Sequence, residues 1–248
     1  MGVLVVTGTG TEVGKTVTTA ALAAVAARAG RSVAVLKPAQ TGVAPGEPGD
    51  VDEVVRLAGD AVTGVELARY PEPLAPGTAA ARSGLAPVRP EQVAEAAAKL
   101  AASHDLVLVE GAGGLLVRFD EEGSTLADAA GLLGAPVLVV AAAGLGTLNS
   151  VQLTGESVRS RGLRQAGVVI GSWPREPGLA ERCNVADLPV VAGAELLGAV
   201  PAGAGAMSPE AFRNGAEGWL APPLGGTWDG ASFARRESPE GFPGPTPS

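Results

Sequence analysis

The sequence has very few of the residues on which disulfide frameworks, His-rich metal sites and aromatic cores depend. Its 248 residues include one cysteine, Cys183, and one histidine, His104, and aromatic residues make up 3%. A single cysteine excludes an internal disulfide and a single histidine excludes a His-rich metal site, so a reducing compartment is the default expectation. The core must be built from Val, Leu and Ala, which suits a chain of alternating strands and helices.

Basic residues are also few and scattered. The 18 Lys and Arg against 26 Asp and Glu give a net charge of −8, without the basic patch that a nucleic-acid partner requires. No basic residue precedes Lys15, so the start of a signal peptide is missing and we expect a cytoplasmic protein. The uncharged segment 129–155 is long enough to cross a bilayer, but Pro136 and several glycines favour a buried strand between turns. We therefore expect no membrane partner.

Short apolar runs alternate with helical segments along most of the chain. Strands are expected at 3–6, 33–36, 106–109, 137–140 and 168–170, and helices at 16–29, 50–58, 91–102 and 150–161. Strands of this kind are buried on both faces, so the pattern predicts a parallel α/β sheet in a single domain over residues 1–225. The Pro/Ala-rich segment 70–90 is expected to be an irregular connection near the site. Residues 226–248 have few apolar side chains and are expected to be a disordered tail.

A glycine-rich loop follows the first apolar run directly. Residues 7–16 read Thr-Gly-Thr-Gly-Thr-Glu-Val-Gly-Lys-Thr, and an Ala-rich helical segment comes next. Glycines allow backbone N–H groups to surround phosphate oxygens, Lys15 can reach the terminal phosphates, and Thr16 can bind Mg²⁺. The usual spacing places a glycine where this chain has Thr9, and Gly8 stands one residue earlier. The pattern therefore predicts a phosphate-binding loop one residue longer than usual.

Polar residues follow the next apolar runs at the same edge of the expected sheet. Lys37 follows the second run and is one of only three lysines against fifteen arginines. Asp50 comes after a Gly/Pro-rich loop, where it could also be a helix cap, and Asp52 is an alternative carboxylate. Glu110 follows the third run and precedes glycines, like the acid that holds Mg²⁺ in P-loop proteins. Ligands of parallel sheets bind at this edge, so we expect these residues to form one site.

Four blocks of the sequence together resemble the dethiobiotin synthetase family. They are Gly-Thr-Gly-Thr-Glu-Val-Gly-Lys-Thr at 8–16, Lys-Pro-x-x-Thr-Gly at 37–42, Val-Glu-Gly-Ala-Gly-Gly at 109–114 and Gly-Leu-Gly-Thr-Leu-Asn at 144–149. The longer phosphate loop is similar to that family's own, and the resemblance covers roughly residues 1–222. It implies a P-loop NTPase-like fold, with a mostly parallel sheet and helices on both faces.

The resemblance also implies a reaction and its partners. The family is a carbon–nitrogen ligase that uses ATP, Mg²⁺ and CO₂ to close a ring on 7,8-diaminopelargonate (7,8-diaminononanoate), giving dethiobiotin in biotin biosynthesis. The substrate supplies both nucleophiles, so catalysis can rest on positioning and charge neutralisation. The family is a homodimer with its active site at the subunit interface, where block 144–149 reaches the substrate of the neighbouring subunit.

Residue roles follow by matching the family's motifs onto this sequence. Lys15 and Lys37 would be catalytic, and Thr16, Asp50 and Glu110 would hold Mg²⁺. The residues implied for the nucleotide are Glu12, Val13, Gly14, Lys15, Thr16, Val17, Asp50, Glu110, Gly111, Ala112, Gly113, Gly171 and Ser172. Those implied for the diamine substrate are Thr11, Thr41, Ala112, Gly113, Leu145, Gly146, Thr147, Leu148 and Asn149.

The chain departs from the family where many members carry an adenine-reading Asn-Asp pair. Gly171 and Ser172 stand there instead, so base recognition through backbone contacts, or use of other nucleotides, is open. A partition or septum-positioning ATPase is one alternative, but it would carry an extra lysine early in the phosphate loop, where this chain has Gly10. A cobyrinate amidase would need a glutaminase domain with a Cys/His pair. A nonenzymatic nucleotide-binding homologue is the third alternative.

Overall fold

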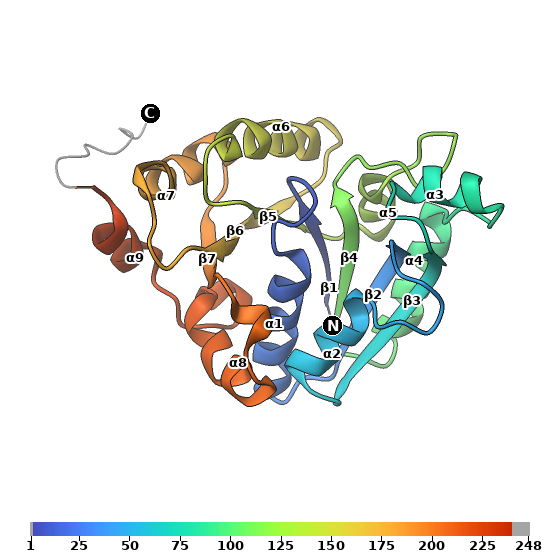
Figure 1. The fold of residues 1–248 in the computed structure, drawn as a ribbon, viewed down its shortest axis with the longest axis horizontal. Helices are drawn as coiled ribbons and strands as arrows, with labels where there is room; N and C mark the ends of the chain where they lie inside the picture. Colours follow the sequence, from blue (N-terminus) through green and yellow to red (C-terminus); the bar gives the residue numbers. More distant parts are fainter. Residues whose placement is uncertain (1, 240–248) are drawn as a thin grey trace.

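The sheet determines where every loop of the site lies. The computed structural model describes residues 2–239. Their seven strands form one parallel sheet in the order β3-β2-β4-β1-β5-β6-β7, and helices connect the strands (Figure 1). The strands are β1 (Gly2–Gly8), β2 (Val33–Thr41), β3 (Val62–Tyr70), β4 (Leu106–Gly114), β5 (Val137–Ala141), β6 (Gln165–Trp173) and β7 (Leu196–Pro201). The parallel α/β sheet and the five expected strands are confirmed, and β3 and β7 extend the sheet at its edges.

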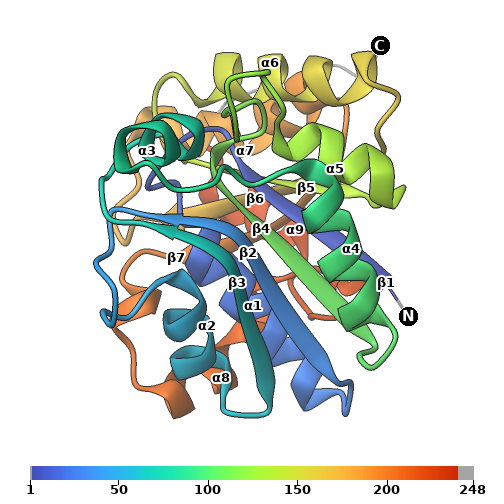
Figure 2. The same cartoon turned by 90° about the vertical axis from the view of Figure 1, so that its right-hand side faces the viewer.

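Helices cover both faces of this sheet, as expected. They are α1 (Lys15–Arg28), α2 (Asp50–Ala58), α3 (Pro76–Ser83), α4 (Pro90–Ala101), α5 (Leu126–Leu133), α6 (Thr147–Ser160), α7 (Leu179–Ala192), α8 (Pro209–Ala216) and α9 (Gly230–Glu237). Helices α1, α2 and α8 pack together on one face, and α4, α5, α6 and α7 lie on the other (Figures 1 and 2).

The central strands are buried on both faces, which explains their continuous apolar runs. Successive residues of β1 and β4 alternate between two cores, so Val5 and Val107 face one and Val6 and Leu108 face the other. Residues 20–26 of α1 are all buried, and the many alanines among them allow the helix to approach the sheet closely. The carboxyl ends of β1, β2 and β4 consequently meet at one edge of the sheet.

Strands β3 and β7 and helices α3, α5, α7, α8 and α9 were not expected from the sequence, and two of these elements, β3 and α3, have a weak apolar signal. The edge strand β3 is buried only at its ends, Val62 and Tyr70, and its remaining residues are partly or fully exposed. The segment 70–90 is not irregular throughout, since Pro76 begins helix α3 beside the ends of β2 and β3 (Figure 2). Its expected place near the site is confirmed below.

The expectation of disorder from residue 226 onward does not hold for residues 226–239. Asp229 accepts a hydrogen bond from the Ser232 N–H at 2.8 Å and begins α9. Phe233 packs against Trp173 and Trp228, with ring centroids 5.1 and 5.2 Å away. A few large aromatic rings bury enough area to hold a short helix, although residues 226–239 have few apolar side chains. The rest of the expected tail, 240–248, lies outside the described residues.

The uncharged segment 129–155 is not a membrane span. It contains the fully buried strand β5 between the end of α5 and the start of α6. No helix within residues 2–239 is long and apolar enough to cross a bilayer.

Candidate active site

The phosphate loop is shaped by contacts between glycines. Glu12 and Gly14 both adopt left-handed backbone conformations, with φ values of 61° and 92°. A Cβ atom at position 14 would also overlap the Gly171 carbonyl of β6, so only glycine fits there. Helix α1 begins at the next residue, Lys15, and its first N–H groups have no intrahelical partner. The loop therefore presents the start of a helix to an anion.

Lys15 reaches back across this loop. Its side-chain Nζ donates to the Gly10 carbonyl at 2.9 Å, and the residue is 8% exposed. Burial, together with the positive charge of Lys37, lowers the pKa of Lys15 below its usual value. An ammonium in this environment gains stabilisation from an added anion, as the terminal phosphates of a nucleotide would provide.

Lys37 lies at the centre of a buried charged cluster. Its Nζ is 2.5 Å from Asp50 Oδ2 and 2.9 Å from Glu110 Oε1, and it donates to the Gly111 carbonyl at 3.2 Å. Burial alone would lower the pKa of Lys37, but the charges of Glu110 and Asp50 more than offset it and raise that pKa. Lys37 therefore remains a protonated ammonium at the sheet edge.

The same cluster has the donor set of a hard divalent cation. The Thr16 hydroxyl donates to Glu110 Oε1 at 2.9 Å, and Lys37 contacts both Glu110 and Asp50, which brings the two carboxylates together. The other carboxylate oxygen, Glu110 Oε2, is buried and has no hydrogen-bond partner among residues 2–239. One hydroxyl and two carboxylates fit Mg²⁺, which takes its remaining ligands from water and phosphate oxygens. No cluster of three or more His, Cys, Asp or Glu suited to a metal occurs in the described part of the chain.

The structure distinguishes the two competing carboxylates at the start of α2. Asp50 points into the cluster, and its backbone N–H donates to Gln40 Oε1 at 2.8 Å. Asp52 instead accepts from the Gly49 N–H at 2.7 Å and lies 3.8 Å from Arg69, with a side chain that is 58% exposed. Asp52 therefore caps the helix, and Asp50 faces the site.

One cavity of about 710 Å³ joins these groups. Its lining includes Thr11, Glu12, Gly14, Lys15, Thr16, Val17, Lys37, Thr41, Asp50, Ala112 and Gly113, all expected from the sequence. Gln40, Val117 and residues 73–76 line the same cavity, although no motif in the sequence pointed to them as site residues. Two signals in the sequence could have indicated them: Gln40 stands near the end of a strand, and residues 73–76 belong to a Pro-rich connection.

The last substrate block lies apart from this cavity. Residues 144–149 are not among its lining, and they form the turn before α6 and its first residues. Leu145 is 92% exposed, whereas Thr147 is buried and its hydroxyl donates to the Ala142 carbonyl at 2.7 Å. Within one chain, the expected substrate residues are thus divided between two places.

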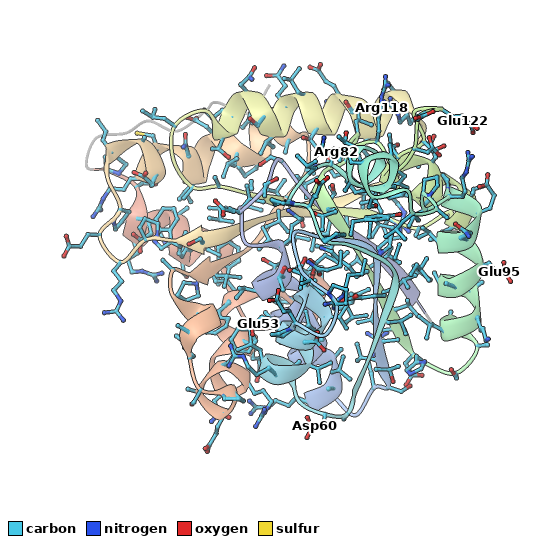
Figure 3. All side chains as sticks on the ribbon, turned by 45° about the vertical axis from the view of Figure 1, so that its right-hand side comes forward. Glu53, Asp60, Arg82, Glu95, Arg118 and Glu122 are labelled. Atoms are coloured by element: carbon cyan, nitrogen blue, oxygen red, sulfur yellow. The ribbon has the colours of Figure 1, made fainter. Side chains whose placement is uncertain are left out.

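Gly171 and Ser172 stand at the end of β6, next to the phosphate loop. A Cβ atom at Gly171 would overlap the Val13 carbonyl, while Ser172 is exposed. Arg56 of α2 pairs with Glu53, which is labelled in Figure 3, and donates to the Gly205 carbonyl at 2.6 Å. The contacts of Arg56 hold the segment that follows β7, a segment to which no motif in the sequence assigned a role.

Comparison with known proteins identifies the family. A family described as an AAA domain matches residues 3–210. ATP-dependent dethiobiotin synthetase BioD of Streptomyces avermitilis is 75% identical over 234 residues, covering 94% of this chain and 98% of that protein. This chain belongs to the dethiobiotin synthetase family. The protein of the same name from Streptomyces coelicolor is 70% identical over 239 residues, with coverages of 96% and 100%. The resemblance of the four sequence blocks is thereby confirmed.

Solved structures show that this dethiobiotin synthetase family member has the P-loop NTPase-like fold expected from its motifs. The septum site-determining protein MinD of Pyrococcus horikoshii, solved with Mg-ADP, superposes with a TM-score of 0.50 at 16% identity, over 93% of this chain and 91% of that one. Signal recognition particle 54 kDa protein of Aeropyrum pernix, solved with GDP, gives 0.53 at 17% identity, over 95% and 48%. At these identities the likeness concerns the fold alone.

Proposed function

We propose that this chain is an ATP-dependent dethiobiotin synthetase that converts 7,8-diaminopelargonate and CO₂ to dethiobiotin, with release of ADP and phosphate. The observation that carries the proposal is that Lys15, Lys37 and Asp50 line one cavity, with Glu110 buried against Lys37, in a chain 75% identical to a protein of that name. We place the enzyme in the cytoplasm, where ATP is available, with no nucleic-acid or membrane partner.

The reaction needs no nucleophile from the protein. One substrate amine captures CO₂ as a carbamate, and a carbamate oxygen takes the γ-phosphoryl group of ATP, which leaves ADP. The second amine then attacks the carbonyl carbon of this mixed anhydride, closes the ring and expels phosphate. The protein must hold the three reactants in line and neutralise their negative charge.

The two lysines divide this electrostatic task. Lys37 keeps its proton because its pKa is raised, so it carries a fixed positive charge for the carbamate and the transferred phosphoryl group. Lys15, tethered to the Gly10 carbonyl at 2.9 Å, reaches the terminal phosphates from the opposite side of the loop. Their side chains line the same cavity, which supports the assignment of both charges to one reacting centre.

We assign a Mg²⁺ site to Thr16, Asp50 and Glu110. Support comes from the unpartnered Glu110 Oε2 and from the hydroxyl of Thr16 beside the same carboxylate. When bound, the ion would neutralise charge on the β- and γ-phosphate oxygens. The chain orients the carboxylate oxygens of Asp50 and Glu110 for the ion through Lys37, which contacts both carboxylates.

The diamine site is proposed to combine two subunits of a homodimer. Thr11, Thr41, Ala112 and Gly113 line the cavity of one subunit, and Leu145, Gly146, Thr147, Leu148 and Asn149 would come from the other. A leucine that is 92% exposed favours a partner surface, as does Leu153 on α6 at 56%. Asn149 and Leu153 are four residues apart and so share a face of the helix.

The nucleotide contacts are assigned to the phosphate loop and to strand ends. Glu12, Val13, Gly14, Lys15, Thr16 and Val17 would surround the phosphates, with Asp50, Glu110, Gly111, Ala112 and Gly113 opposite them and Gly171 and Ser172 beyond. Gly171 has no side chain to read a base, so its part is to support Gly14. We infer weak discrimination among nucleoside triphosphates.

Phosphate release provides the test. The purified protein is assayed with ATP, Mg²⁺ and bicarbonate, with and without the diamine, and dethiobiotin is measured by mass spectrometry. We expect release that depends on the diamine, matches dethiobiotin in amount and collapses in Lys37→Ala. Release without the diamine, or no release, would instead favour a P-loop switch or a nonenzymatic homologue.

A further inference from the structure

A buried asparagine on α7 holds the turn that precedes α6. Asn184 is 6% exposed, and its Nδ2 donates to the carbonyls of Ala143 and Gly144 at 2.7 and 3.1 Å. A buried amide is costly unless its donors are paired, and both contacts here go to one turn. Asn184 therefore fixes the backbone of the turn from behind.

The turn is also held from within. The Thr147 hydroxyl donates to the Ala142 carbonyl at 2.7 Å, and Gly146 takes the left-handed conformation, with φ of 87°. Three successive carbonyls, at 142, 143 and 144, are thus engaged on the inner side. The Thr147 N–H donates to the Gly144 carbonyl at 3.3 Å and the Ser150 N–H to the Gly146 carbonyl at 3.2 Å, which leaves the N–H groups of Leu148 and Asn149 without a backbone partner within residues 2–239.

This segment offers an anion no positive charge, only backbone N–H groups and the exposed amide of Asn149. Residues 142–149 contain no charged side chain, so a carboxylate would depend on the N–H groups and the dipole at the start of α6. Glu181, three residues before Asn184 on α7, approaches the same turn, and its Oε1 is 3.0 Å from the position of a Cβ at Gly144. Because a misplaced turn would weaken these hydrogen bonds and no lysine or arginine would compensate, the position of the backbone decides the affinity.

We propose that Asn184 is a positioning residue for the substrate. By holding the carbonyls of Ala143 and Gly144, it presents the N–H groups at the start of α6 to the carboxylate of a diamine bound in the neighbouring subunit. The inference rests on the proposed function and on its homodimer. Asn184 is not among the residues that line the cavity.

Steady-state kinetics of Asn184→Ala and Asn184→Ser test this role. We expect KM for the diamine to rise about tenfold in Asn184→Ala, equivalent to about 1.4 kcal/mol, with kcat and KM for ATP within twofold of wild type. Asn184→Ser keeps one donor, so its KM for the diamine should lie between those of wild type and Asn184→Ala. Leu188→Ala is the matched control, because Leu188 is buried on the same helix and should lower Tm without changing KM for the diamine.

The outcomes separate this inference from the proposed function. If the wild type is active and KM for the diamine is unchanged in both Asn184 variants, the inference alone is overturned. The same holds if KM for the diamine rises as much in Leu188→Ala as in Asn184→Ala. A wild type that forms no dethiobiotin overturns both.

A mixed dimer tests which subunit receives the turn. We would co-express Lys37→Ala and Asn184→Ala chains with different tags and purify the heterodimer. If the turn serves the neighbouring subunit, one site carries both defects and the other carries none, so about half the wild-type kcat remains at the wild-type KM. A raised KM in the heterodimer would place the turn in its own subunit's site and overturn the proposal.

Discussion

Replacing Lys37 by alanine should damage both the chemistry and the stability of this synthetase. The side chain contacts Asp50 at 2.5 Å, Glu110 at 2.9 Å and the Gly111 carbonyl at 3.2 Å. Loss of one preorganised charge-stabilising group costs about 2.7–4 kcal/mol, or 10²–10³ in kcat. We therefore expect kcat of Lys37→Ala to fall at least a hundredfold, while the affinity for nucleotide changes less.

The stability change follows from the burial of Glu110. Its carboxylate is 1% exposed, and removing one partner of a buried ion pair costs about 3–5 kcal/mol. Asp50 is 35% exposed and lines the cavity, so water can enter and the lower value, about 3 kcal/mol, is expected. For a chain of this size that lowers Tm by about 6–12 °C.

Three variants compared in parallel with wild type, namely Lys37→Ala, Lys37→Arg and Lys99→Ala, make this prediction decisive. Lys37→Arg keeps the charge but replaces a compact ammonium by a planar fork, so it should retain more stability than Lys37→Ala without regaining activity. Lys99→Ala removes an exposed lysine of α4 and should match wild type. Scanning calorimetry and dethiobiotin formation are measured on each. A Lys37→Ala enzyme within tenfold of wild-type kcat would refute the assignment of the reacting centre.

Three further predictions concern the metal, the base and the end of the chain. Asp50→Asn should lower kcat far more than Asp52→Asn, because only Asp50 faces Lys37; equal losses in Mg²⁺-titrated assays, or the reverse order, would contradict that assignment. Competition among ATP, GTP, CTP and UTP should show weak discrimination, and a strict preference for ATP would mean that another residue reads adenine. Phe233→Ala removes a ring that packs on Trp173 and Trp228. The loss should cost about 3–5 kcal/mol of stability and leave the KM values of the substrates unchanged. An unaltered melting curve would show that α9 adds nothing to the stability of the domain.

The sequence predicted those parts of the molecule in which a local pattern and a tertiary requirement coincide. The runs that became β1, β2 and β4 are continuous because both faces are buried, and the groups that follow them, Lys37 and Glu110, meet because parallel strands end at one edge. Glycine spacing in the phosphate loop is equally local. These features required no knowledge of distant contacts.

Other features depend on contacts that no local pattern reveals. Strand β3 has polar residues because it lies at the edge of the sheet, and α9 is stable because Phe233 reaches Trp173, sixty residues earlier in the chain. The separation of 144–149 from the cavity likewise follows only from the three-dimensional arrangement. The resemblance favoured Asp50 over Asp52, but the physical reason, the capping contact of Asp52 with the Gly49 N–H, is visible only in the structure.

The contact between Gly14 and Gly171 has a consequence for changing the nucleotide preference of this enzyme. The strand end from which an adenine-reading side chain would extend is the surface against which the phosphate loop rests. Gly171→Asn would push its Cβ into the Val13 carbonyl and so displace the loop that holds the phosphates. A base-specific side chain and a closed phosphate loop thus compete for one volume, and selectivity for adenine has to be introduced from Ser172 or from the segment beyond β7.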